Sequence, residues 1–227
     1  MSEFRRRLMM NVPEYGDNIP RGCVPLLYIE GTGTQWIDTE HIVMPYEDIF
    51  LDFQYPVAIK DAAYYLFGWR WDGTADDSYH CVCERYFNYA LNLCYGIPVK
   101  RNGGSLINHT NTTIRNYYKI SPNEKKVLIS GKVQSIYDKT FTNAYNRDKG
   151  SVYPCYIFTV NNKGTETTNK APMRLYEYSL TDANGNYTQR LIPILDKNGV
   201  ACMYDTVRKK YHYNKGTGEF LYKILEQ

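Results

Sequence analysis

Apolar side chains recur at every second position through most of the chain, which is the spacing of a β-strand with one buried face. Ile49, Leu51 and Phe53 fall on one side of such a strand, and Asp52 falls on the other. The same alternation runs through residues 81–95, a stretch long enough for two strands. The pattern therefore predicts a sheet protein and not a helical one.

Short runs of the same kind continue along the sequence, and each predicts a strand. They lie at Lys126–Ser130, Tyr153–Val160, Met173–Leu180, Leu191–Leu195, Val200–Tyr204, Lys210–Tyr213 and Glu219–Ile224. Clusters of Asn, Asp and Gly separate these runs and favour tight turns. Only residues 138–149 could form a short helix. Many short strands with regular turns are typical of an antiparallel β-sandwich, so we expect residues 23–227 to form one all-β domain.

Residues 1–22 differ from the rest of the chain. Pro and Gly are frequent there and the apolar side chains follow no clear period, so we expect an extended N-terminal arm. One interpretation is a docking arm, whose apolar side chains insert into a partner while its arginines pair with acidic groups. The other is a disordered tail. The docking residues would be Phe4, Arg5, Arg6, Arg7, Leu8 and Met9.

The composition excludes several classes of protein. The chain has 227 residues, with 27 Lys and Arg against 24 Asp and Glu, so the net charge is +3. This is too little for binding nucleic acid by phosphate neutralisation, unless the positive charges gather on one face. The sequence has no run of about 18 apolar residues, the length that a membrane-spanning helix needs. Arg5–Arg7 are not followed by the apolar region of a secretory signal. The 23 tyrosines favour β structure, and Tyr also suits sugar sites and interfaces.

Patterns of catalytic residues are absent from the sequence. Retaining glycosidases built on a β-sandwich space their carboxylates as Glu-x-Asp-x-x-Glu on one strand, whereas Glu47 and Asp48 are adjacent and would face opposite sides. No Gly-x-Ser-x-Gly nucleophile elbow occurs. The histidines form no spaced pair, and we expect surface or hydrogen-bonded core groups at His41, His80, His109 and His212. We therefore predict no enzymatic activity and no cofactor.

Two short patterns could hold a metal ion, and each has a simpler interpretation. His80, Cys81 and Cys83 lack a second Cys or His pair, so we expect free thiols and no zinc site, as for the other cysteines. The segment Asp182–Asn186 has the alternating oxygen ligands of a calcium loop but no closing Glu. We expect a polar hairpin tip there, and we predict no metal site.

One acidic loop is a candidate binding site. Aromatic rings stand at both of its ends, where they could stack on a sugar while the carboxylates accept hydroxyl protons. The residues of this glycan or partner site would be Trp69, Trp71, Asp72, Asp76, Asp77 and Tyr79. The alternative is that Trp69 and Trp71, two positions apart, pack on one face of a sheet.

Two stretches of the chain carry a family resemblance. The first is Tyr28–Thr39. The second contains, in order, Met173–Leu180, Arg190–Pro193, Asp196–Val200, Met203–Thr206, Lys210–Tyr211 and Asn214–Phe220. They resemble the opening strand pair and the closing module of the concanavalin A-like, or laminin G-like, jelly-roll domains of phage virion proteins and of gut-bacterial surface proteins. Tyr156–Phe158 resembles the strand before that module, and the middle third of the chain matches only in strand pattern. The glycines of Gly216–Gly218 are expected to permit positive φ in a turn.

The resemblance implies a jelly-roll β-sandwich with an N-terminal arm. It also implies a structural component of a tailed-phage virion, in a tail, baseplate or head appendage, that is assembled in the host cytoplasm. Its partners would be other virion proteins, further copies of the chain and host-surface carbohydrate. The alternative is a carbohydrate-binding surface module of a gut bacterium, which would need an export signal.

Overall fold

The computed structural model describes residues 18–56, 64–70, 80–85, 91–96, 104–107, 113–122, 124, 126–130, 132–133 and 152–226. The regular elements of these residues are β-strands, and none of them is an α-helix. The all-β class expected from the alternating pattern is thus confirmed. The expected short helix at 138–149 lies outside the described residues.

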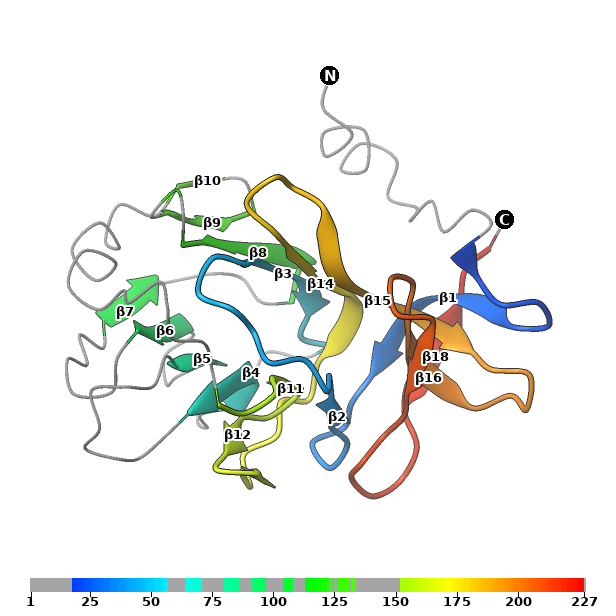
Figure 1. Ribbon diagram of the computed structural model, residues 1–227. Helices are drawn as coiled ribbons and strands as arrows, with labels where there is room; N and C mark the ends of the chain where they lie inside the picture. Colours follow the sequence, from blue (N-terminus) through cyan, green and yellow to red (C-terminus); the bar gives the residue numbers. More distant parts are fainter. Residues whose placement is uncertain are drawn as a thin grey trace.

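The larger sheet joins strands from both ends of the chain (Figure 1). Its neighbouring strands are, in order, β10 (Lys132–Val133), β9 (Lys126–Ile129), β8 (Asn116–Ser121), β3 (Asp48–Gln54), β14 (Arg174–Thr181), β1 (Val24–Glu30), β15 (Tyr187–Leu195), β16 (Ala201–Asp205) and β17 (Lys210–His212). The strand β18 (Leu221–Ile224) also pairs with β1. Neighbouring strands in this sheet are antiparallel, as expected.

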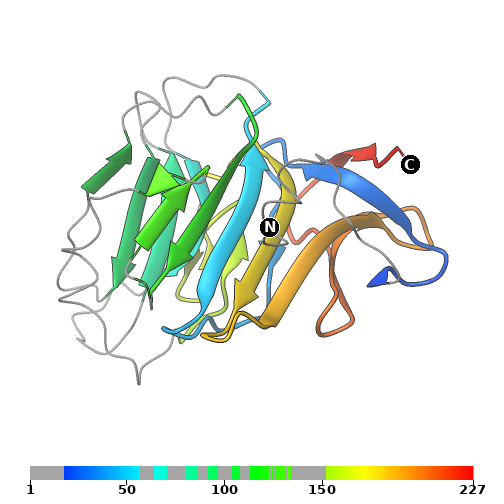
Figure 2. The same cartoon turned by 90° about the horizontal axis from the view of Figure 1, so that it is seen from above.

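The second sheet lies across from the first. Its order is β13 (Thr165–Glu166), β12 (Asn161–Asn162), β4 (Tyr64–Arg70), β5 (His80–Arg85), β6 (Leu91–Gly96) and β7 (Gly104–Ile107), and β11 (Tyr156–Ile157) joins β4 to β2 (Ile37–Asp38). One pair, β12 with β4, is parallel. Figures 1 and 2 show the two layers of strands.

The main hydrophobic core fills the space between the sheets. On β3, Ile49, Leu51 and Phe53 are at most 1% exposed and face this core, as the alternating pattern predicts. Phe67 of β4 contacts Tyr178 of β14, with ring centroids 6.3 Å apart. Because these side chains come from opposite sheets, the fold is a β-sandwich.

A second, smaller core lies on the other face of β15 and β16. Its buried residues are Ile192, Ile194, Cys202 and Tyr204, and Ile19, Cys23, Tyr211 and Leu225 pack against it. The strand β15 thus contributes to two cores from its two faces, since Leu191 belongs to the main one. The segment that precedes β1 covers this second core, so residues 18–23 are packed on the domain.

Two hairpin loops have the same hydrogen-bonding geometry. The Oδ1 atom of Asp182 accepts bonds from the amides of Asn184 and Asn186 at 2.9 and 2.8 Å. Asp196 does the same with Asn198 and Val200, also at 2.9 and 2.8 Å. The carboxylate of Asp182 is thus engaged by N–H donors, which is the chemistry of a polar hairpin tip.

Candidate functional site

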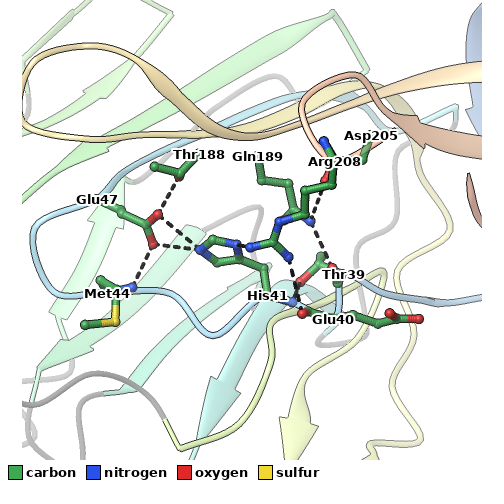
Figure 3. A network of polar contacts seen from close by, with 9 residues as sticks. All are labelled: Thr39, Glu40, His41, Met44, Glu47, Thr188, Gln189, Asp205 and Arg208. Carbon is green, nitrogen blue, oxygen red and sulfur yellow. Dashed lines mark hydrogen bonds and ion pairs between the residues drawn. The ribbon is translucent and has the colours of Figure 1, made fainter. Parts of the chain in front are cut away.

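A buried histidine and a buried glutamate stand at the centre of a polar network between β2 and β3 (Figure 3). The Nε2 atom of His41 lies 3.0 and 3.1 Å from the two carboxylate oxygens of Glu47. Glu47 also accepts bonds from the amide of Met44, at 2.7 Å, and from the hydroxyl of Thr188. Burial alone would raise the pKa of Glu47, but its hydrogen bonds outweigh burial and hold the pKa below the ordinary value.

The second ring nitrogen of His41 has a cationic neighbour. A terminal guanidinium nitrogen of Arg208 contacts Nδ1 of His41. Because a guanidinium has donors and no acceptor, Nδ1 must accept this bond. The proton of the neutral imidazole therefore sits on Nε2, which donates to Glu47.

Arg208 is held by the turn that joins β16 to β17. The Oδ1 atom of Asp205 accepts bonds from the amides of Val207 and Arg208 at 2.9 and 3.1 Å. Its Oδ2 atom accepts a bond from Gln189 at 3.3 Å, and Gln189 also donates to the carbonyl of Thr39 at 2.9 Å. The buried carboxylate thus fixes the turn from inside.

An exposed ion pair links the same two parts of the chain at the surface. Lys210 contacts the carboxylate of Glu40, and this hydrogen bond holds the pKa of Glu40 below its ordinary value. Nearby, Nδ1 of His212 donates to the carbonyl of Asp38 at 2.9 Å. Burial lowers the pKa of His212 and so favours the neutral imidazole. A neutral ring with its proton on Nδ1 can still donate this hydrogen bond.

The arrangement is suited to holding segments together. A general base needs a free lone pair, but the one on His41 accepts from Arg208, and both oxygens of Glu47 already accept hydrogen bonds. The network therefore acts as a clamp that joins residues 39–47 to β15 and to the β16–β17 turn. The expectation of hydrogen-bonded core histidines is confirmed for His41 and His212, while the side chains of His80 and His109 lie outside the described residues.

A second contact joins the two stretches that carry the family resemblance. The backbone amide of Trp36 donates to the side chain of Asn214 at 3.1 Å, and the amide of Lys215 donates to the carbonyl of Trp36 at 2.9 Å. Gln35 donates to the carbonyl of Glu219 at 2.9 Å, across 184 residues of sequence. Residues 34–36 and 214–219 thus interlock through a backbone hydrogen bond and through the side chains of Gln35 and Asn214.

Aromatic rings complete this interlock on its inner side. The ring of Phe158 lies 5.2 Å from that of Phe220, and it lies so close to Gly31 that a Cβ there would stand 2.8 Å from it. The ring of Trp36 lies 4.5 Å from that of Tyr156. Tyr156–Phe158, the third stretch of the resemblance, therefore packs against both of the others.

The outer face of the larger sheet carries rings and charges in a row. The guanidinium of Arg174 lies 4.7 Å from the ring centroid of Tyr28, and that of Arg115 lies 4.0 Å from the ring of Tyr176. The two tyrosine rings are 5.5 Å apart. Arg115 also binds Asp52 through two hydrogen bonds of 2.8 and 2.7 Å. Burial raises the pKa of Asp52 in spite of this pairing. Tyr176 is only 5% exposed, so the ring of Tyr28, which is half-buried, is the one that the row offers to solvent.

The structure places one residue of the predicted glycan site in the core. Trp69 is 1% exposed and belongs to the main hydrophobic core, so for this residue the structure supports core packing and not the binding surface. Its alternation on β4 turns the ring inward, which is the packing that was considered as the alternative. Trp71, Asp72, Asp76, Asp77 and Tyr79 lie outside the described residues, and so do the docking residues Phe4–Met9.

Sequence reasoning did not find the clamp. His41 and Glu47 lie in a segment without regular structure, and 167 residues separate His41 from Arg208. Strand periodicity gives no signal for such a group.

Within the described ranges, no three His, Cys, Asp or Glu side chains are grouped as metal ligands. None of the described segments is a helix that could span a membrane. No protein-family model matches the chain, and no curated protein is significantly similar to it.

Proposed function

We propose that this chain is a non-enzymatic structural component of a tailed-phage virion, in a tail, baseplate or head appendage. In this proposal the sandwich has the concanavalin A-like jelly-roll topology and residues 1–22 form the docking arm. Neighbouring virion proteins and further copies of the chain are its partners. The protein is assembled in the host cytoplasm and carried in the virion.

The packing of residues 34–36 against 214–219 is the observation that carries the proposal. These segments are the ones that resemble virion modules, and their characteristic residues are accounted for by bonds that they make with each other. The engagement of His41 and Glu47 by internal partners supports a non-enzymatic role. Fold alone does not determine function, so the assembly role needs its own test.

The test is incorporation into particles of the phage that encodes the chain. Reversing the charge of the arm with Arg5→Glu, Arg6→Glu and Arg7→Glu is expected to leave a folded protein that is lost from purified virions. The matched control replaces the same three residues by Lys, which keeps the charge, and is expected to incorporate. Normal incorporation of the reversed variant would contradict docking by the arm. Absence of the unaltered chain from virions would contradict the proposed function as a whole.

A second candidate function is glycan recognition, either on the virion or as a surface module of a gut bacterium. The half-buried ring of Tyr28, with the guanidinium of Arg174 beside it, favours this function, because rings stack on sugars and polar groups bind hydroxyls. A glycan array with the variants Tyr28→Ala and Trp71→Ala tests both candidate surfaces. Loss of binding in one variant, with unchanged thermal stability, would identify the surface. Unchanged binding in both, or no binding by the unaltered protein, would contradict this function.

A further inference from the structure

The strand β18 forms an open margin of the larger sheet. It pairs with β1 on one side, and within the described part of the chain no strand pairs with its other side (Figure 2). All four side chains are exposed, and Leu221, Tyr222 and Ile224 expose 55, 46 and 49% of their surface. An unpaired edge with apolar side chains is the usual acceptor for an added strand.

The register with β1 shows which way each side chain of β18 faces. Tyr222 and Ile224 stand opposite Ile29 and Leu26, which are fully buried in the main core. These two side chains therefore face the same side of the sheet as the main core, at its margin, and they remain about half exposed. A strand added beside β18 would need apolar residues at the same level in order to cover them.

The other face of β18 carries one charged and one apolar side chain, Lys223 and Leu221. Lys223 stands opposite Tyr28, on the outer side of the sheet, and is exposed. An added strand would pair more stably with β18 if the side chain directly across from Lys223 were negatively charged, and less stably if it were positively charged. Since facing sides alternate along a strand, the part of the added segment that lies beside Tyr222, Lys223 and Ile224 would carry an acidic residue between two apolar ones.

A second copy of β18 does not meet this requirement. A two-fold axis pairs antiparallel strands so that equivalent residues share a face. Any such pairing that joins three residues of β18 to its copy places Lys223 opposite or diagonal to the Lys223 of the other chain. Repulsion between the two lysines disfavours that pairing. A partner strand with a negative charge at this position would pair with β18 more stably.

We propose that β18 binds an extended segment of a partner protein in which an acidic residue lies between two apolar ones. The segment adds as a further strand, with its apolar side chains covering Tyr222 and Ile224 and an acidic side chain opposite Lys223. This inference rests on the proposed role in an assembly, and it gives the chain an attachment surface separate from the arm.

The test uses the full chain and two blocked synthetic peptides, Ser-Val-Glu-Val-Glu-Val-Ser and Ser-Val-Lys-Val-Lys-Val-Ser. Amide hydrogen exchange in residues 221–224, followed by mass spectrometry, reports strand addition. We expect the acidic peptide to protect this segment with an affinity about tenfold higher than the basic one. Lys223→Glu should reverse the preference, whereas the matched surface variant Lys197→Glu should keep it.

Several outcomes would overturn the inference. These are equal protection by both peptides, no protection at millimolar peptide, and an unchanged preference in Lys223→Glu. Protection that rises with protein concentration without peptide would show self-pairing of β18 and would also overturn it.

The inference and the proposed function fail in different ways. If Lys223→Glu leaves virion incorporation unchanged while charge reversal in the arm abolishes it, the virion role stands and β18 is not an attachment surface. If the chain is absent from virions but the peptides bind as expected, β18 is an acceptor edge in another assembly.

Discussion

The carbonyl oxygen of Thr34 lies against the α-carbon of Gly216, in the space where a Cβ on any other residue would stand. The carbonyl carbon of Thr34 and the Cα of Gln35 would be only 3.0 and 3.1 Å from that Cβ. All three are backbone atoms, so no side-chain rotation can relieve the contact. Gly216 is thus required by the close approach of two chain segments.

Replacing Gly216 by Ala should therefore separate the interlocked segments. We expect the free energy of unfolding to fall by about 3 kcal/mol, since the backbone must shift to admit a methyl group. Urea unfolding measures the change. The neighbouring variant Thr217→Ala is the control, because Thr217 contributes backbone atoms to the interlock and its side chain is exposed. A loss in Gly216→Ala no larger than in the control would contradict the account.

This glycine shows where sequence interpretation stops. The pattern Gly216–Gly218 predicted positive φ in a turn, and Gly218 does have a φ of 74°. Gly216 is not among the residues with positive φ, and its role depends on a segment near Thr34 that is far away in sequence. Local spacing reports the local backbone, whereas a close approach depends on tertiary packing.

Replacing Glu47 by Gln tests the clamp around His41. In the variant, the NH₂ group of the amide would face the N–H donors of His41 and Met44, which now bond to the carboxylate. Because two donors cannot bond to each other, we expect the free energy of unfolding to fall by about 2 kcal/mol at neutral pH. The folded pKa of Glu47 lies below its ordinary value of 4.5. Its ionised form therefore stabilises the fold above that value, and this contribution disappears as the pH falls through the folded pKa.

The difference between Glu47→Gln and the unaltered protein should consequently shrink on acidification. Urea unfolding at neutral and acidic pH measures it, with the exposed Glu226→Gln as a control that should show little difference at either pH. A deficit that stays constant with pH would mean that lost packing, and not lost ionisation, destabilises the variant.

The strands were more predictable than the sites for a physical reason. On β3 each side chain faces the core or the solvent in turn, so burial repeats every two residues and the sequence carries that period. The clamp uses single residues from three separate segments, and no period links His41, Thr188 and Arg208. Trp69 shows the same limit, because its place beside an acidic loop allowed both a binding role and core packing, and only the structure shows that its strand turns the ring inward.

The buried thiols should resist alkylation in the folded protein. Burial raises the pKa of Cys155 and of Cys202 to about 12, which removes the reactive thiolate. Brief iodoacetamide treatment at mildly alkaline pH, followed by mass spectrometry, should leave both unmodified, and unfolding in urea should make both reactive. Cys23 is partly exposed and serves as the comparison that reacts first. Labelling of Cys155 or Cys202 at the rate seen in urea would contradict their burial.

The pairing of β1 has a consequence for how the protein is made. Its hydrogen-bonding partners β14, β15 and β18 all come from the last part of the sequence. During synthesis Leu26 and Ile29 therefore leave the ribosome long before the strands that bury them. The nascent chain must keep this apolar strand from pairing wrongly until β18 emerges, so the domain cannot complete its larger sheet before that point, and the waiting strand is a natural site for a chaperone to bind.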